Sequence, residues 1–171
     1  VSFPCCMVDR ITPATTKADL DRIAAAEGQL DLAAVVHEPF RQWVIEDDFS
    51  SGRPDWAVAG AQFVSDVERH ELMKLRCLNG THSTLAYLGY LAGHETIADA
   101  VAAPAFAALC VRLWHEETLP TLPQPEDEDL QAYCAALLVR YRNPAIQHRT
   151  WQIAMDGSQK LPQRILDTLR D

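Results

Sequence analysis

Apolar residues recur every three or four positions over much of the chain, which is the period of α-helices. The clearest case lies in residues 126–142, where the recurring spacing outlines a single buried helical face. The acidic residues 126–129 at its start are typical of a helix N-terminus, although an acidic metal or partner site would have the same composition. The residues of the apolar face are Leu130, Tyr133, Cys134, Leu137, Leu138 and Tyr141.

Capping signals set the ends of two further helices. Thr16 and Asp19 form an approximate capping box, and Gly28 follows as a C-cap. Ser65 and Glu68 form a second capping box, in front of a long apolar stretch. Together with the period of the apolar residues, these signals predict helices over residues 17–27, 65–92, 95–117, 126–142, 145–155 and 160–170.

Residues 32–63 have a different composition, rich in β-branched and aromatic side chains and interrupted by glycine and proline. This pattern predicts loops and short strands at residues 33–37 and 42–46. We therefore expect a mainly α-helical fold with a few short strands near residues 33–46.

Candidate chemistry lies in the long helix over residues 65–92. An ideal α-helix turns about 100° per residue, which places His82 about 80° and Asn79 about 140° around the axis from Lys74. Met73 and Cys77 on the opposite side are apolar as well, so we expect this helix to be buried almost all round. Its polar side chains then need partners inside the protein.

These three side chains suit proton transfer to an oxygen atom. Burial without a fixed counter-charge lowers the pKa of a lysine toward the range useful for a general acid or base. Asn79 can donate hydrogen bonds to a developing alkoxide without carrying charge, and His82 can hold a hydroxyl group. Spacing alone leaves open an ion pair between Lys74 and Glu71, a core histidine at His82 and a helix break at Asn79.

Charge and cysteine content exclude several classes of protein. The net charge of −9 argues against a nucleic-acid-binding domain, and no apolar run approaches the roughly 18 residues of a membrane span. The five cysteines are odd in number and lack CxxC spacing, so we expect neither a disulfide framework nor a zinc site. We expect a reduced, cytoplasmic protein. Without an initiator Met or a leader, it reads as a piece of a longer chain.

Four ordered blocks resemble one enzyme family. Residues 74–82, KLRCLNGTH, resemble the KxxxxNxxH motif of the polyol-specific long-chain dehydrogenases, the mannitol dehydrogenase family. Three other blocks agree with this family in order and spacing, and the resemblance covers essentially the whole chain. They are residues 3–13, residues 38–47, and residues 143–146 running into residues 156–160.

The resemblance implies a metal-independent, NAD-dependent oxidoreductase that acts on a linear sugar derivative. Lys74 would be the general acid/base, Asn79 an oxyanion donor and His82 a substrate-orienting partner. Val8 and Asp9 match positions that line the cofactor and substrate cleft, and Lys160 matches a substrate-contacting lysine. Family members add a second oxyanion asparagine in the N-terminal domain, outside these residues. From the residues alone, Asp9 also suits a turn or a pair with Arg10.

One departure from the polyol dehydrogenases bears on the substrate. Members that oxidise mannitol or arabinitol have an arginine eight residues before the lysine, where this chain has Gln152. Residues 148–164 instead resemble the fructuronate reductase branch, whose sugar acids D-fructuronate and D-mannonate carry a carboxylate. Arg149 or Arg164 would recognise that carboxylate through a planar guanidinium, unless each merely lies on a solvated helix face.

The chain lacks a dinucleotide fingerprint, because no two of its glycines are separated by a single residue. We therefore expect the Rossmann domain, and with it most of the NAD site, to precede residue 1. Residues 1–15 would be the end of that domain or a linker, and residues 16–171 a helical substrate-binding and catalytic domain with a further C-terminal segment. The expected partners are a sugar-acid or polyol substrate and that Rossmann domain, with no nucleic acid and no membrane. A mannitol or other polyol 2-dehydrogenase is the alternative enzyme, and a non-catalytic helical module the alternative class.

Overall fold

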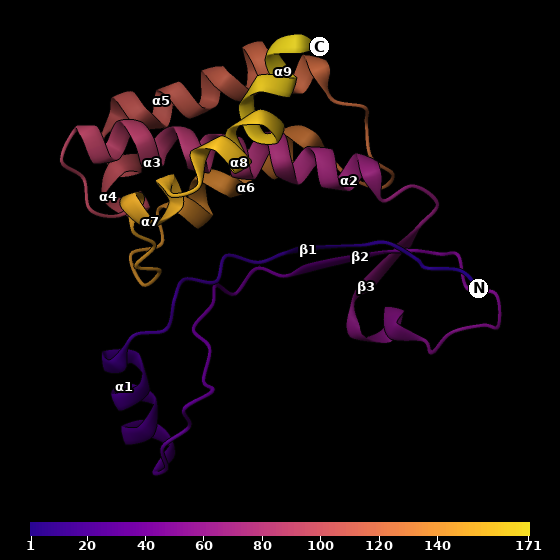
Figure 1. Ribbon diagram of the computed structural model, residues 1–171, viewed down its shortest axis with the longest axis horizontal. Helices are drawn as coiled ribbons and strands as arrows, with labels where there is room; N and C mark the ends of the chain where they lie inside the picture. Colours follow the sequence, from indigo (N-terminus) through magenta and orange to yellow (C-terminus); the bar gives the residue numbers. More distant parts are fainter.

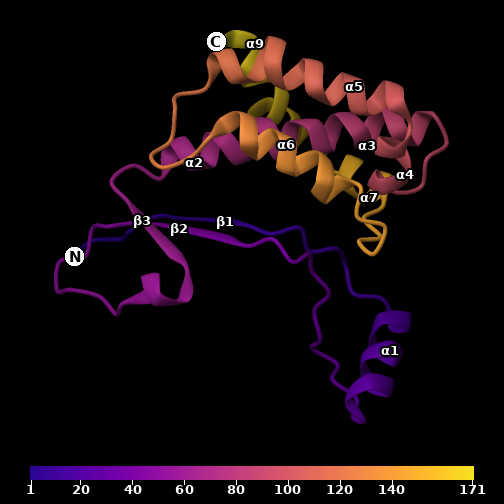
Figure 2. The ribbon, with the colours of Figure 1, turned by 180° about the vertical axis from the view of Figure 1, so that it is seen from behind.

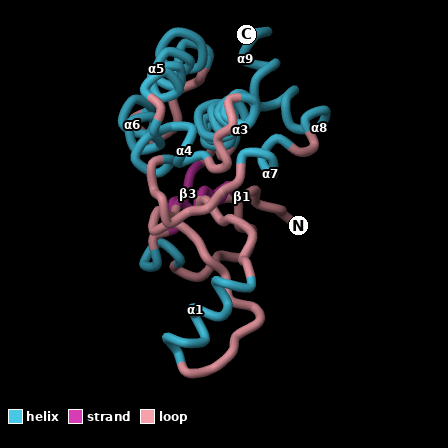
Figure 3. Tube along the Cα trace, turned by 90° about the vertical axis from the view of Figure 1, so that its left-hand side faces the viewer, coloured by secondary structure: helices cyan, strands magenta, loops and turns pink.

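The computed structural model describes residues 1–171 and shows a layer of helices lying over a small β-sheet (Figure 1). Helix α1 (Lys17–Glu27) stands apart from that layer, on the far side of the sheet (Figures 2 and 3). The capping box of Thr16 and Asp19 and the left-handed C-cap Gly28 are confirmed, with φ 73° at the glycine. No residue of α1 is buried, so its caps and other local interactions, rather than tertiary packing, specify this helix.

Three strands form the sheet in the order β1 (Cys6–Asp9), β2 (Gln42–Glu46) and β3 (Ala61–Val64). Strands β1 and β2 are antiparallel, whereas β2 and β3 are parallel. The prediction of a strand at residues 42–46 is confirmed. The strand predicted at residues 33–37 is wrong, because that segment forms no ladder with another strand. One hydrogen bond, from Thr15 Oγ to the Ala34 carbonyl at 3.1 Å, joins it to residues 11–15, and Glu38 just after it donates its N–H to the Ile11 carbonyl.

The long central helix runs as α2 (Glu68–Met73), a π-helical stretch η2 (Lys74–Gly80) and α3 (Thr81–Leu91). The predicted capping box of Ser65 and Glu68 is wrong. Ser65 Oγ instead donates to Glu126, and the carboxylate of Asp66 accepts the Glu68 backbone N–H at 3.0 Å. The prediction that this helix is buried almost all round is confirmed for residues 70–87, none of which is exposed, whereas Leu88 and Ala92 are exposed.

Helix breaks divide the second half of the chain more finely than periodicity predicted. The helix expected over residues 95–117 is interrupted at Ala103, which is extended because Pro104 follows it. Residues 126–129 lie outside their helix, with Asp129 as its N-cap. Residues 145–149 are not helical, and the last helical run begins earlier than residue 160. The elements are α4 (Ile97–Ala102), α5 (Pro104–Arg112), η3 (Leu113–Thr118), η4 (Leu119–Thr121), α6 (Leu130–Tyr141), α7 (Thr150–Ala154), α8 (Gly157–Leu161), η5 (Pro162–Leu166) and α9 (Asp167–Arg170).

The main hydrophobic core lies within the helical layer, around Met73, Cys77, Leu85, Trp114 and Leu137. A smaller cluster joins the three strands to Val67, the residue just before α2. No helix is both long enough and apolar enough to cross a membrane.

Buried side chains bind the backbone of the π-helical stretch η2. The Cys77 carbonyl accepts Trp114 Nε1–H at 2.9 Å, and the Leu78 carbonyl accepts the Tyr141 hydroxyl at 2.8 Å. A π-turn leaves carbonyls without their usual i+4 donor, and buried carbonyls are costly to leave unpaired. These donors from η3 and α6 therefore stabilise the altered helical geometry.

Candidate active site

A cavity of about 300 Å³ opens where the end of β1 meets η2, α7 and α8. Most of the site residues predicted from the sequence line it, although they come from distant parts of the chain. Val8 lies beside it, and Arg149 lies elsewhere. The lining residues are Asp9, Arg10, Ile11, Lys74, Leu78, Asn79, His82, His148, Gln152, Ile153, Lys160 and Arg164.

Lys74 is the first residue of η2, and its ammonium group donates a hydrogen bond to the Val8 backbone carbonyl. The structure contains no ion pair between Lys74 and Glu71, which was the alternative left open by the spacing. A strand carbonyl, rather than a neighbouring helical carboxylate, therefore orients the amine at the cavity.

Asn79 lies five residues after Lys74 within the same π-helical stretch. In π-geometry the hydrogen bonds run from i to i+5, so residues five apart face the same side, whereas an α-helix would separate them by about 140°. Both side chains line the cavity, and Asn79 makes no side-chain hydrogen bond within the chain. Its amide is therefore free to bind a ligand beside the Lys74 amine.

His82 lies on the next turn and is buried. Its ring stacks on Tyr141 with centroids 5.3 Å apart and meets the edge of the His148 ring at 4.8 Å. Burial lowers the pKa of His82 well below its usual value, and the positive charge of His148, when that ring is protonated, and of Arg164 acts in the same direction. Burial and the Lys160 charge lower the pKa of His148 to about 4. Both imidazoles are therefore neutral near pH 7.

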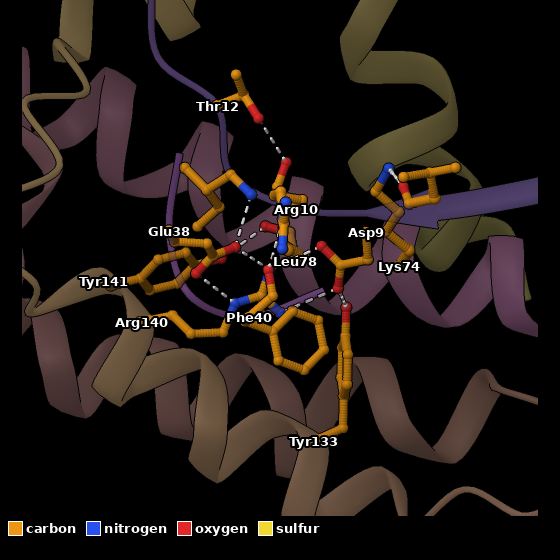
Figure 4. A network of polar contacts seen from close by, with 12 residues as sticks. Asp9, Arg10, Thr12, Glu38, Phe40, Lys74, Leu78, Tyr133, Arg140 and Tyr141 are labelled. Carbon is orange, nitrogen blue, oxygen red and sulfur yellow. Dashed lines mark hydrogen bonds and ion pairs between the residues drawn. The ribbon is translucent and has the colours of Figure 1, made fainter. Parts of the chain in front are cut away.

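Asp9 is buried at the cavity wall, and Arg140 holds its carboxylate in a bidentate ion pair at 2.9 and 2.7 Å (Figure 4). The same guanidinium binds Glu38, and the Tyr133 hydroxyl donates to Asp9 at 2.7 Å. The turn and the pair with Arg10 considered for Asp9 are not what the structure contains, because Asp9 belongs to a strand.

Arg140 and Glu38 were not among the predicted site residues. Arg140 lies seven positions after Tyr133, on the buried face of α6, so a charge within that apolar stripe was the available signal. Glu38 begins the block of residues 38–47 that resembles the family, but nothing within that block distinguished it as a site residue.

Two basic side chains from the last helical run reach the cavity. Lys160 lies 3.6 Å from Asp156, and Arg164 donates to Ser83 Oγ at 3.1 Å. The Arg164 Nε–H is buried without a partner in the chain, and burial lowers the pKa of this guanidinium. Arg149 is exposed and lies outside the cavity, next to Thr96 in an isolated bridge. Of the two arginines considered for a carboxylate, only Arg164 lines the cavity.

Family models match most of the chain. The mannitol dehydrogenase C-terminal domain matches residues 66–171, and the mannitol dehydrogenase Rossmann domain matches residues 1–58. The Rossmann-domain match thus extends beyond residues 1–15, the segment assigned to that domain from the sequence. It ends just before β3, which completes the sheet formed with β1 and β2.

Among curated proteins, D-mannonate oxidoreductase of Escherichia coli K12 is 60% identical over 170 residues, which is 99% of this chain and 35% of that protein. Mannitol 2-dehydrogenase of Aspergillus fumigatus is 42% identical over 99% of this chain and 34% of its own length. The chain thus spans about a third of the length of these relatives.

Two solved structures superpose on the chain. Mannitol 2-dehydrogenase of Pseudomonas fluorescens, in ternary complex with NAD and D-mannitol, has a TM-score of 0.91 and 39% identity, covering 99% of this chain and 34% of its own. A D-sorbitol dehydrogenase in substrate-free form has a TM-score of 0.90 and 36% identity, covering 99% of this chain and 35% of its own.

Proposed function

The chain belongs to the mannitol dehydrogenase family, and from that premise we propose that it forms the substrate-binding and catalytic part of an NAD-dependent oxidoreductase that interconverts D-mannonate and D-fructuronate. The observation that carries this proposal is the cavity in which Lys74, Asn79 and His82 meet Asp9 and Arg164. The first three residues suit a reacting carbonyl, whereas Arg164 suits an acid group on the same substrate.

Lys74 acts as the general acid in ketone reduction and as the general base in alcohol oxidation. Reduction adds a hydride to the carbonyl carbon and a proton from the Lys74 ammonium to the carbonyl oxygen, so that ketone, NADH and H⁺ become alcohol and NAD⁺. The Val8 carbonyl keeps the amine at the cavity when it carries this proton. Proton transfer by a positioned side chain is worth about 10² to 10⁴ in rate.

Asn79 and His82 complete the polar wall around the reacting oxygen. The Asn79 amide, which has no partner in the chain, donates to the oxyanion that develops as hydride arrives. His82 is neutral and packed between Tyr141 and His148, so its ring is fixed and can orient a substrate hydroxyl. Asp9 adds an acceptor for hydroxyl groups along the same wall.

NADH supplies the hydride when it is bound. Within this chain Val8 and Asp9 are the residues proposed to face it. Val8 fits a nicotinamide ring, because its side chain is exposed while its carbonyl binds Lys74, which leaves an apolar surface beside the reacting group. The dinucleotide itself needs a glycine-rich turn that these residues lack, so the Rossmann domain of the same protein completes the site.

The basic end of the cavity favours a sugar acid over a neutral polyol. Arg164 and Lys160 line it, and the unpaired Nε–H of Arg164 leaves a donor for a carboxylate oxygen. The high identity to D-mannonate oxidoreductase supports the same choice. The second candidate is a mannitol or other polyol 2-dehydrogenase, favoured by the superposition on the mannitol 2-dehydrogenase complex. A non-catalytic helical module is the remaining alternative.

The test compares two ketones in the full-length protein. We expect NADH-dependent reduction of D-fructuronate with a kcat/KM at least about tenfold above that for D-fructose, because a neutral sugar leaves the carboxylate site unpaired. Equal or better turnover of fructose would move the assignment to the polyol branch. Absence of turnover with both ketones and with mannitol would favour the non-catalytic module. We also propose that the protein is cytoplasmic, in agreement with this metabolic role.

A further inference from the structure

Arg140 makes more charged hydrogen bonds than any other side chain around the cavity. Its guanidinium donates to both oxygens of Asp9, at 2.9 and 2.7 Å, and to both oxygens of Glu38, at 3.0 and 2.7 Å. The face of the guanidinium lies 4.0 Å from the centre of the Phe40 ring. All three charged side chains are more than nine-tenths buried.

Stability alone is a weak reason for such a cluster. Two carboxylates and one guanidinium are removed from water, and packed apolar residues often replace buried ion pairs without loss of stability. The cluster is also far from local in sequence, because α6 supplies Arg140 while β1 and the segment before β2 supply the carboxylates. The cluster therefore serves to hold β1 and the segment before β2 in a fixed position against α6.

The cluster fixes the short segment that supplies the acceptor of Lys74. Asp9 is gripped by Arg140 and by the Tyr133 hydroxyl, and the Ile11 backbone N–H donates to Glu38 at 2.6 Å. The Val8 carbonyl, which accepts the Lys74 ammonium, is joined to Asp9 by one peptide bond. Figure 4 shows these contacts side by side, with Lys74 on one side of Asp9 and Arg140 on the other.

We propose that Arg140 is a positioning residue, which acts through Asp9 and Glu38 to place the Val8 carbonyl and thereby the Lys74 amine. This proposal rests on the proposed function, because it assigns the role of Arg140 relative to the acid/base group. Arg140 does not line the cavity and touches no reacting atom. Its effect on chemistry passes through the backbone of residues 8–11.

The shape of the guanidinium is central to this role. Arginine presents five N–H donors in a rigid planar fork, whereas lysine presents three donors from one flexible point. Arg140→Lys therefore keeps the positive charge but cannot bind all four carboxylate oxygens. Residues 8–11 then lose a fixed position, although the charge balance of the cluster is kept.

The test measures the full-length enzyme with Arg140→Lys, using D-fructuronate and NADH. We normalise kcat to the concentration of sites that bind NADH, so that unfolded protein is not counted. We expect this kcat per NADH-binding site to fall about 10²-fold, a loss that a displacement of a reacting group by about 1 Å can cause. The KM for the sugar acid rises as well, because Asp9 lines its cavity, whereas the Kd for NADH stays within about twofold. A purely structural role would lower the Tm and leave kcat per NADH-binding site and KM unchanged.

Arg76→Lys is the matched control. Arg76 is 6% exposed, donates to Thr121 and pairs with Asp171, away from residues 8–11. We expect a lower Tm with kcat per NADH-binding site within about twofold of wild type. An equal loss of kcat in both variants would overturn the proposal, as would wild-type kcat and KM in Arg140→Lys.

Two further measurements cover the remaining outcomes. If Arg140→Lys does not fold, Tyr133→Phe removes one bond to Asp9 and keeps the fork, and a smaller fall in kcat of about threefold or more is expected. Wild-type kcat in Tyr133→Phe would then overturn the proposal.

If the wild type turns over no substrate, the proposed function fails, and labelling of the Lys74 amine by trinitrobenzenesulfonate still tests the positioning. We expect labelling to speed up severalfold in Arg140→Lys and not in Arg76→Lys, and equal rates would overturn it.

Discussion

At the scale of single residues, Lys74 and Asn79 face the same cavity from the same π-helical stretch, but their proposed tasks differ. Lys74 transfers a proton, a task that a small soluble base can share once the side chain is removed. Asn79 donates a hydrogen bond from a fixed point, and a freely diffusing molecule reproduces that poorly. Chemical rescue therefore separates the two roles.

In the full-length enzyme, Lys74→Ala should lower kcat by about 10² to 10⁴ with far less effect on NADH affinity. Added primary amines should restore part of the rate. Asn79→Ala should lower kcat by about 10² to 10³, without rescue by amines. Steady-state kinetics with an amine series measures both effects. A wild-type pH profile for alcohol oxidation in Lys74→Ala would contradict the acid/base role.

The two arginines considered for the substrate carboxylate give a second prediction at this scale. Arg164 lines the cavity and Arg149 does not, so Arg164→Ala should lower kcat/KM for D-fructuronate about 10- to 10²-fold, the value of a charge-assisted hydrogen bond. Arg149→Ala is the matched control and should change kcat/KM less than about twofold. Activity with fructose should respond little in either variant. A larger loss in Arg149→Ala would reverse the assignment.

At the scale of elements, the contact between η2 and η5 decides where Arg164 lies. Gly80, at the end of η2, lies so close to η5 that a Cβ atom would be 2.7 Å from the Arg164 carbonyl oxygen. This is the backbone of another helix, so a side chain at position 80 must push η5 outward. The glycine therefore permits the approach that brings Arg164 to the cavity.

Gly80→Ala should destabilise the protein by about 1–3 kcal/mol through overpacking and should also raise the KM for the sugar acid, because η5 carries Arg164. Gly89→Ala provides the comparison, since its Cβ would lie 2.9 Å from Ala100 Cβ, at the contact between α3 and α4. We expect that variant to lower the Tm without changing the KM. Thermal unfolding and substrate titration measure the two effects, and an unchanged KM in Gly80→Ala would argue against this account.

At the scale of the whole molecule, burial of imidazoles between helices links stability to pH. The pKa of His148 is lowered from 6.5 to about 4 by burial and by Lys160, and the pKa of His82 is lowered in the same direction. An imidazole whose folded pKa is depressed binds fewer protons in the folded state. Its contribution to stability is therefore fully present above about pH 6.5 and is lost as the pH falls toward 4.

The shift at His148 corresponds to a loss of about 2 kcal/mol between pH 7 and pH 5. We expect the Tm of the full-length protein to fall more over this interval than the Tm of His148→Gln, which has no imidazole to protonate. Scanning calorimetry at the two pH values measures the difference. Equal decreases in Tm would show that protonation of His148 does not contribute.

Local chemistry accounts for what the sequence predicted correctly. The capping box of Thr16 and Asp19, the left-handed Gly28 and the strand at residues 42–46 depend on residues a few positions apart, so their patterns are visible in the sequence. The resemblance to the KxxxxNxxH motif, in contrast, pointed to Lys74, Asn79 and His82, which line one cavity.

The sequence by itself determined the helical class and most helix positions, because periodicity and caps act within a few residues. The resemblance to the family added Asp9, Lys160 and Arg164, which also line the cavity. Only the tertiary structure decided how these groups meet. Donors from distant helices stabilise the π-turn that brings Asn79 beside Lys74, and Arg140 binds Asp9 across 131 positions of sequence. Packing also decides that Arg164 and not Arg149 lines the cavity, because the burial of a side chain depends on neighbours in space that no local pattern encodes.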